Sequence, residues 1–309
     1  MQMFGFRVDG KLLMSLAKET TEVQGWNSIA VDREGDTSRL IRCLGFPPIK
    51  FINPRPQRGC CQVYASNYGG GLVDGDSIRM RVECGAGSHL YLGTQSSTKV
   101  YKSQGKGGCL QETVGTVHAN SLTVVCPDPV VPFAGSRYRQ VQNWEVHPEA
   151  DLILFDWLQP GRTARGEVFA FDRLRTELRI TRPGGVPILS DRFGLDPGSQ
   201  DPFRCGHYGA FRSFLSVYMI GPRALKLAES LEAGILGLNG PGQAERTADG
   251  MGGVSASPLW VSVGKREGEG YLIRAMGGDR RDLQPLHDML FAALADTAWL
   301  GFNPWHRRW

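Results

Sequence analysis

Apolar and polar residues alternate along much of the chain, and glycine or proline separates the alternating runs every few residues. Between residues 78 and 83, and again between 173 and 180, apolar side chains alternate with arginine and glutamate. A period of two is typical of strands that bury one face. The run DLILFDWL at 151–158 is apolar almost throughout, which predicts a strand covered on both faces. The pattern therefore predicts a mostly-β protein.

Only two segments repeat apolar residues at the spacing of a helix, and both lie in the C-terminal third. The first follows Pro222 and carries Leu227, Leu231, Ile235 and Leu238. The second carries Leu283, Leu286, Leu290 and Leu294, and we expect Asp282 to cap it. Proline at 285 falls in the first turn, where it is tolerated. We therefore expect about two α-helices beside the strands.

The organisation of the chain favours one domain over residues 1–309. Two loops, 192–206 and 238–258, are dominated by glycine, proline and small polar residues. Strand-like segments lie on both sides of each loop, so neither separates two self-sufficient halves. We treat residues 1–35 as an N-terminal extension without an assigned element, and we expect 238–258 to be a flexible glycine-rich loop.

Composition narrows the class of protein. The 309 residues are 41% hydrophobic, which is enough for a sizeable core, and the formal net charge is only +4, so nucleic acid is not the expected partner. Seven cysteines without a Cys-x-x-Cys pair favour a reducing compartment. The chain has no run of about 18 apolar residues and no secretion-like opening. We expect a cytoplasmic protein without a membrane segment.

The common enzymatic signatures are absent. The sequence contains no Gly-x-Ser-x-Gly, no Gly-x-Gly-x-x-Gly and no His-Glu-x-x-His, which argues against the simplest hydrolases, dehydrogenases and metalloproteases. The run SQGKGG at 103–108 has a lysine among glycines but lacks the spacing of a phosphate-binding loop, so we interpret it as a hairpin turn.

Two polar clusters precede residue 102. The first, NYGGGLVDGD at 67–76, brings Asp74 and Asp76 to a glycine-rich turn that is not an EF-hand. The second, GTQSSTKVY at 93–101, offers five small polar side chains, Ser97 among them. Turn aspartates bonded to nearby backbone amides, and a surface strand with solvated hydroxyls, would explain both clusters without any function.

A third cluster, DWLQPGRTARGE, runs from Asp156 to Glu167. An unpaired buried carboxylate is costly, so Asp156 should have a partner, and Arg162 or Arg165 is the expected one. Such an ion pair can be purely structural. The functional alternative is that these carboxylates line a wet passage.

Taken in order, four segments resemble the UreD (UreH) family of urease accessory proteins. They are GGGLVDGD, TQSSTKVYKS, PDPVVPFAGSRYRQ and DWLQPGRTARGE. The resemblance is specific between about residues 40 and 180 and continues weakly to the C-terminal LGFNPWHRRW. It implies strands wound into a helix-like stack of sheets, a β-solenoid-like fold, together with a pair of helices.

The resemblance also implies a function without catalysis. A protein of this family binds the urease apoenzyme together with UreF and the GTPase UreG, and helps nickel reach the urease active site through a polar internal tunnel. The implied cargo is transient Ni²⁺, with no tightly bound cofactor. Candidate tunnel-lining residues are Asp74, Asp76, Ser97, Asp156 and Glu167, because oxygen ligands can relay a divalent ion without trapping it.

Other interpretations stay open at this stage. His89 and His118 could contribute to an ion route, although a structural role is the simpler interpretation. A β-rich hydrolase could use Asp76 and Glu167 as acid and base. A carbohydrate-binding module could use the seven tryptophans, in which case an exposed aromatic stripe is expected.

Overall fold

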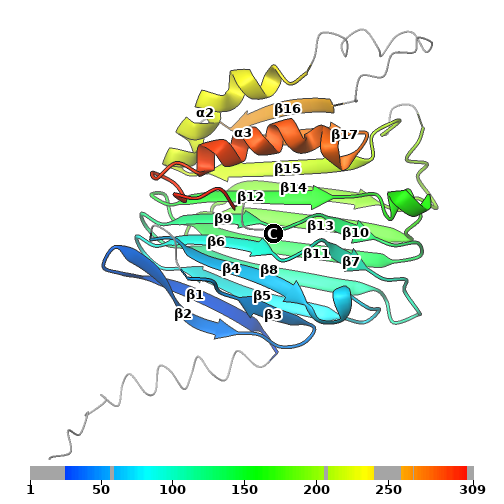
Figure 1. Ribbon diagram of the computed structural model, residues 1–309, viewed down its shortest axis with the longest axis horizontal. Coiled ribbons are helices and arrows are strands. Elements are labelled where there is room, and N and C mark those ends of the chain that lie inside the picture. Colours follow the sequence, from blue (N-terminus) through cyan, green and yellow to red (C-terminus); the bar gives the residue numbers. More distant parts are fainter. Residues whose placement is uncertain (1–24, 56–58, 205–207, 240–258, 267, 305–309) are drawn as a thin grey trace, which may run out of the picture.

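The computed structural model describes residues 25–55, 59–204, 208–239, 259–266 and 268–304. In these ranges the chain is mostly strands, which pass back and forth between two facing sheets to build a β-solenoid-like stack of about four turns (Figure 1). Two helices complete the C-terminal part. The predicted fold class is confirmed.

The first sheet holds seven strands in the order β14-β13-β11-β8-β5-β1-β2. Its inner strands pair in parallel, and the outermost strand at each end pairs antiparallel to its neighbour. The strands are β1 (Asn27–Glu34), β2 (Thr37–Leu44), β5 (Ser77–Cys84), β8 (Cys109–Val117), β11 (Arg137–Val146), β13 (Arg173–Thr181) and β14 (Pro187–Leu195). Strand β1 lies within residues 1–35, the segment treated above as an extension without an assigned element.

The second sheet holds ten strands, with β16-β17-β15-β12-β9-β6-β4-β3 as its main path. Two short strands lie off this path: β10 pairs with β12, and β7 pairs with β10. The strands β4, β6, β9 and β12 pair in parallel, and both ends are antiparallel. The strands are β3 (Ile49–Ile52), β4 (Cys61–Asn67), β6 (His89–Thr94), β7 (Thr98–Val100), β9 (Leu122–Cys126), β10 (Val130–Pro132), β12 (Asp151–Leu158), β15 (Ser213–Ile220), β16 (Leu259–Arg266) and β17 (Gly270–Gly277).

The two helices, α2 (Pro222–Leu236) and α3 (Gln284–Leu294), lie on the outer face of the second sheet (Figure 1). Their apolar sides pack on outward-facing residues of β12, β15 and β17, which explains why β12 is buried on both faces as predicted. Both predicted helices are confirmed. The predicted cap is corrected: a 3-10 turn (η3, Arg280–Leu283) precedes α3, and Asp279 caps that turn in a reciprocal box with Asp282.

Apolar side chains fill most of the space between the sheets, as the alternating pattern predicted. Ile78, Met80 and Val82 of β5 point inward, as do Leu174, Leu178 and Ile180 of β13. They belong to two separate clusters, one at each end of the strands. Short 3-10 turns at Tyr68–Gly70 and Thr163–Arg165 connect strands outside these clusters.

Two loop predictions have different outcomes. The segment 103–108 is not a hairpin turn, because it connects β7 of the second sheet to β8 of the first. The predicted flexible loop at 238–258 lies almost entirely outside the described residues.

Candidate functional site

A polar band crosses the inner face of the first sheet. The parallel strands pair in register, so inward-facing residues line up in rows across the sheet. One row contains Gln111, Gln140 and Thr176. The next contains Thr113, Gln142 and, beyond Leu178, Asp191. The rows on either side are largely apolar and belong to the two inter-sheet clusters. The polar band therefore separates two apolar layers.

The second sheet presents a matching polar row. Asp156 of β12 pairs in register with Ser216 of β15, which pairs with Arg274 of β17, which pairs with Ser262 of β16. These four strands are antiparallel neighbours, so the four side chains lie on one face. Polar residues thus line the interior from both sheets.

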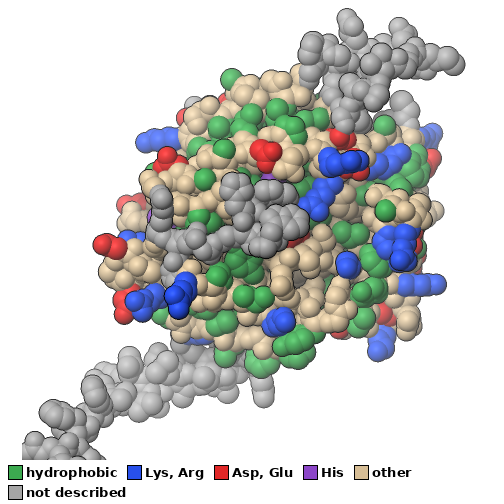
Figure 2. All heavy atoms as spheres, viewed as in Figure 1, with side chains coloured by type: hydrophobic (Ala, Val, Ile, Leu, Met, Phe, Trp, Pro, Cys, Tyr) green, Lys and Arg blue, Asp and Glu red, His purple; other side chains and the backbone are tan. Residues whose placement is uncertain are grey.

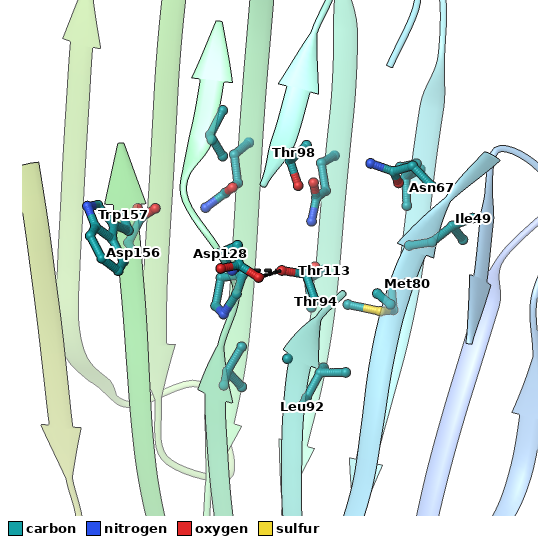
Figure 3. Close-up of a pocket in the computed structure, with 18 of the residues that line it drawn as sticks. Ile49, Asn67, Met80, Leu92, Thr94, Thr98, Thr113, Asp128, Asp156 and Trp157 are labelled. Carbon is teal, nitrogen blue, oxygen red and sulfur yellow. Dashed lines mark hydrogen bonds between the residues drawn. The ribbon is translucent and has the colours of Figure 1, made fainter. Parts of the chain in front are cut away.

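A small cavity of about 60 Å³ lies within the band, close to β6, β9 and β12. A buried water needs roughly 10–15 Å³ of such space, so the cavity has room for several waters. Figure 3 shows Asp128 bonded to Thr94, with Asp156 on the neighbouring strand β12. The polar lining consists of Asn67, Thr94, Ser96, Thr98, Gln111, Thr113, Asp128, Gln140, Gln142 and Asp156.

A larger cavity of about 350 Å³ lies toward β14, β15 and β17. Its walls combine aromatic rings with charged and hydroxyl groups. The lining includes Asp156, Thr176, Asp191, Arg192, Phe193, Tyr208, Phe214, Ser216, Tyr218, Trp260, Ser262 and Arg274. Asp156 lines both cavities, so one carboxylate stands where the two spaces adjoin.

Asp156 has an unusual electrostatic environment for a carboxylate. Burial raises its pKa to about 6, and the negative charge of Asp191 adds to this effect, while a hydrogen bond from Gln140 opposes it. Gln140 is itself held by the buried Tyr138, whose hydroxyl lies 3.0 Å from its Oε1 atom. The expected ion pair with Arg162 or Arg165 is wrong, because Arg162 pairs with Glu167 instead.

Asp191 carries the second carboxylate of the larger cavity. The Nη2 atom of Arg274 lies 2.7 Å from both of its oxygens, and the Tyr218 hydroxyl donates to Oδ2. Asp191 is on the first sheet, whereas Arg274 and Tyr218 are on the second. The ion pair therefore links the two sheets across the cavity.

Comparison with known proteins identifies the family. A family model described as UreD urease accessory protein matches residues 24–309. The chain belongs to the UreD family of urease accessory proteins. It is 33% identical to the urease accessory protein UreD of Cytophaga hutchinsonii over 264 residues, 85% of this chain and 90% of that protein. It is also 36% identical to the UreD of Sorangium cellulosum, over 92% of this chain and 84% of that one.

The likeness extends to plants. The urease accessory protein D of Arabidopsis thaliana is 36% identical over 175 residues, which is 55% of this chain and 60% of that protein. These relatives are named accessory proteins of urease, which agrees with the resemblance drawn from the four polar and glycine-rich segments.

Two of the candidate residues, Asp74 and Asp76, accept backbone N–H groups with their carboxylates. The oxygens of Asp74 accept backbone N–H groups of Gln104, Lys106 and Gly108, each at 2.7 Å, and these bonds lower its pKa. The Oδ2 atom of Asp76 accepts the N–H of Val73 at 2.8 Å. The Asp74 carboxylate thus lies at the centre of the glycine-rich 103–108 loop, where three backbone N–H groups surround its negative charge.

Two further UreD candidates also lie away from the cavities. Glu167 pairs with Arg162 and accepts the N–H of Ala134 at 3.3 Å, and its partners lower its pKa. Ser97 is half-buried just before β7. Neither residue, nor Asp74 or Asp76, lines either of the two cavities. The structure does not bring these four together with Asp156, and their tunnel role stays a prediction.

The two histidines considered earlier are also outside the cavities. The Nε2 atom of His118 lies 3.3 Å from Glu83 Oε1 on the outer side of the first sheet. His89 starts β6, where burial and two arginines lower its pKa. Within the described ranges, no group of three or more His, Cys, Asp or Glu side chains could hold a metal ion.

Sequence reasoning missed most of the polar band. In RYRQVQNWEV, Gln140 and Gln142 share the inward face with Tyr138 and Trp144, whereas Val141 points outward. The sequence signal for the polar band was that two glutamines occupy the same alternate positions as two large aromatic residues, which marks them as inward-facing. Asp191 and Arg274 had no comparable local signal, because the sequence around each one looks like an exposed strand face.

The described residues contain no helix long and apolar enough to span a membrane. On the face that carries the helices, lysine and arginine side chains form separate groups among apolar and polar ones (Figure 2).

Proposed function

We propose that this UreD family chain is a non-catalytic accessory protein that helps nickel reach the urease apoenzyme, and that Ni²⁺ moves through its polar interior. The observation that carries the proposal is the position of Asp156, a half-buried carboxylate shared by two cavities within one polar band. A carboxylate is expensive to bury, so its presence between two apolar layers calls for a function.

The ligand chemistry of the band suits transit. The polar side chains around the small cavity are carboxylates, amides and hydroxyls, whose oxygens bind hydrated divalent ions more weakly than thiolate or imidazole groups do. The small cavity has room for waters that would complete the shell of a moving ion. Weak, successive contacts would allow the ion to leave each position as readily as it arrives.

The partners belong to the same proposal. We take the urease apoenzyme as the recipient, with UreF and the GTPase UreG completing the complex that supplies nickel. None of the six described cysteines is in a disulfide, which fits work in the cytoplasm.

The rival functions have less support. A two-carboxylate hydrolase would need Asp76 and Glu167 free to face a substrate, and neither lines a described cavity. Asp76 instead accepts the N–H of Val73 in its own turn, and Glu167 pairs with Arg162 and accepts the N–H of Ala134. A carbohydrate-binding module would use exposed aromatic residues. Among the described tryptophans only Trp260 is exposed, which does not make a stripe.

The test is activation of apo-urease with nickel, bicarbonate, GTP, UreF and UreG. Activity should depend on the chain, and Asp156→Asn should slow activation several-fold while the complex still assembles. The matched control is Asp172→Asn, which removes a carboxylate from an exposed ion pair with Arg137. Equal activation rates for Asp156→Asn and the wild type would refute the internal route, and activation without the chain would refute the accessory role.

A further inference from the structure

The ion pair between Arg274 and Asp191 lies inside the larger cavity, in line with Asp156. Arg274 is on β17 and pairs in register with Ser216 of β15, which pairs with Asp156 of β12. Only β15 separates the strand of the arginine from that of the shared carboxylate, and both residues line the larger cavity. The Asp191 charge acts on Asp156, since it contributes to the raised pKa of that residue. The two carboxylates therefore belong to one electrostatic site.

The two partners differ in exposure. The side chain of Asp191 is 17% exposed, whereas that of Arg274 is 50% exposed. Asp191 also accepts a hydrogen bond from the Tyr218 hydroxyl, a contact that does not involve the arginine. Arg274 has a long, flexible side chain that is already partly in solvent, so it is the partner that can leave the ion pair.

Arg274 sets the net charge that a cation meets. While it pairs with Asp191, the guanidinium neutralises one carboxylate and repels a divalent cation coming from the Asp156 side. When it moves to solvent, Asp191 and Asp156 become two uncompensated carboxylates in one cavity. The cavity then attracts a divalent cation far more strongly.

We propose that Arg274 is a gate in the ion route: it occupies Asp191 when no cation is present, and an arriving divalent cation displaces it. This inference rests on the proposed function and adds a regulating residue to it. The larger cavity therefore loses the arginine from Asp191 only when a divalent cation arrives. Without a cation, the ion pair keeps the net charge of the cavity close to zero.

The experiment compares Arg274→Gln with Arg139→Gln in the activation assay, with free Ni²⁺ varied. Arg139 is the matched control, since it also forms an ion pair with a carboxylate, Glu177 at 2.9 Å, but is 57% exposed and lines neither cavity. Removing the gating charge should lower the half-maximal nickel concentration on the order of tenfold, whereas Arg139→Gln should leave it unchanged. Direct titration of the full chain with Ni²⁺ should show the same tighter binding for Arg274→Gln.

Two results would overturn the gate. One is an Arg274→Gln chain with wild-type nickel dependence in both measurements. The other is an Arg274→Gln chain that is impaired as much as Asp191→Asn, since the arginine would then only hold Asp191 in position. If Arg274→Gln does not fold, Arg274→Lys should shift the nickel dependence in the same direction but less, and a shift in the opposite direction contradicts the proposal.

The failure of the gate differs from the failure of the route. If Asp156→Asn slows activation and Arg274→Gln behaves as wild type, only the gate is wrong. If Asp156→Asn activates normally, the internal route is wrong, and an effect of Arg274→Gln would not rescue it.

Discussion

Asp151, at the start of β12, caps helix α2 more than seventy residues further along the chain. Its Oδ1 atom accepts the backbone N–H groups of Arg223 and Ala224, both at 2.9 Å. The residue before the helix is Gly221, which has no side chain to act as a cap. A Cβ atom added there would lie 2.0 Å from the carbonyl oxygen of Ala150, so no larger residue fits. The carboxylate therefore satisfies the free N–H groups of α2 and ties the helix to the second sheet.

The first prediction concerns this cap. Asp151→Ala should lower the free energy of unfolding by roughly 1–2 kcal/mol, because two helix N–H groups lose their acceptor. Asp151→Asn should cost less, since its amide oxygen still accepts. Urea unfolding measures both values. Equal losses for the two variants would mean that the charge, rather than the hydrogen bonds, stabilises this junction.

The second prediction concerns Gly115, which pairs in register with the buried Trp144. A Cβ atom added at Gly115 would lie 2.1 Å from Cε3 of the Trp144 ring. Gly115→Ala should therefore destabilise the fold by roughly 1–3 kcal/mol through overpacking. Gly194→Ala is the control, because its added Cβ would have only an ordinary contact at 3.9 Å. Similar melting temperatures for the two variants would contradict the close packing at Trp144.

The fold was largely predictable because burial of one face imposes a period of two on each strand. The segments around Ile78 and Leu174, and the doubly buried run that begins at Asp151, became strands as expected. The pairing order was not predictable from that pattern, since a strand with one apolar face is compatible with many neighbours. The family resemblance supplied the stacked arrangement.

The candidate site was predictable only where an acid interrupts an apolar strand. Asp156 stood out for that reason and does line both cavities. Asp191 and Arg274 are 83 residues apart, and only the facing of the two sheets brings them together. The local sequence around each one looks like an exposed strand face, so sequence reasoning had no physical basis for choosing them.

The third prediction separates a structural from a transport role for Asp74. The bonds to the 103–108 loop lower the pKa of Asp74 in the folded protein. The ionised carboxylate therefore stabilises the fold at any pH above the pKa that Asp74 has in the unfolded chain, and this stabilisation is lost as the pH falls through the folded pKa. At neutral pH, Asp74→Asn should speed hydrogen exchange at the amides of Gln104, Lys106 and Gly108. Urease activation by the stably folded variant should stay near wild type, and a large loss would support the tunnel role predicted from sequence.

The fourth prediction uses the raised pKa of Asp156. The folded pKa is about 6, above the ordinary 3.8, so the folded protein binds this proton more tightly and loses stability as the pH rises from about 4 to about 6. Asp156→Asn removes that loss while its amide oxygen can still accept from Gln140.

The variant should therefore match the wild type near pH 4 and exceed its unfolding free energy by roughly 1–3 kcal/mol above pH 7. Denaturant unfolding across this pH range measures the difference. A more stable but slower-activating Asp156→Asn chain would show that the carboxylate is retained for function at the expense of stability, whereas a variant less stable than the wild type at every pH would make Asp156 a structural residue.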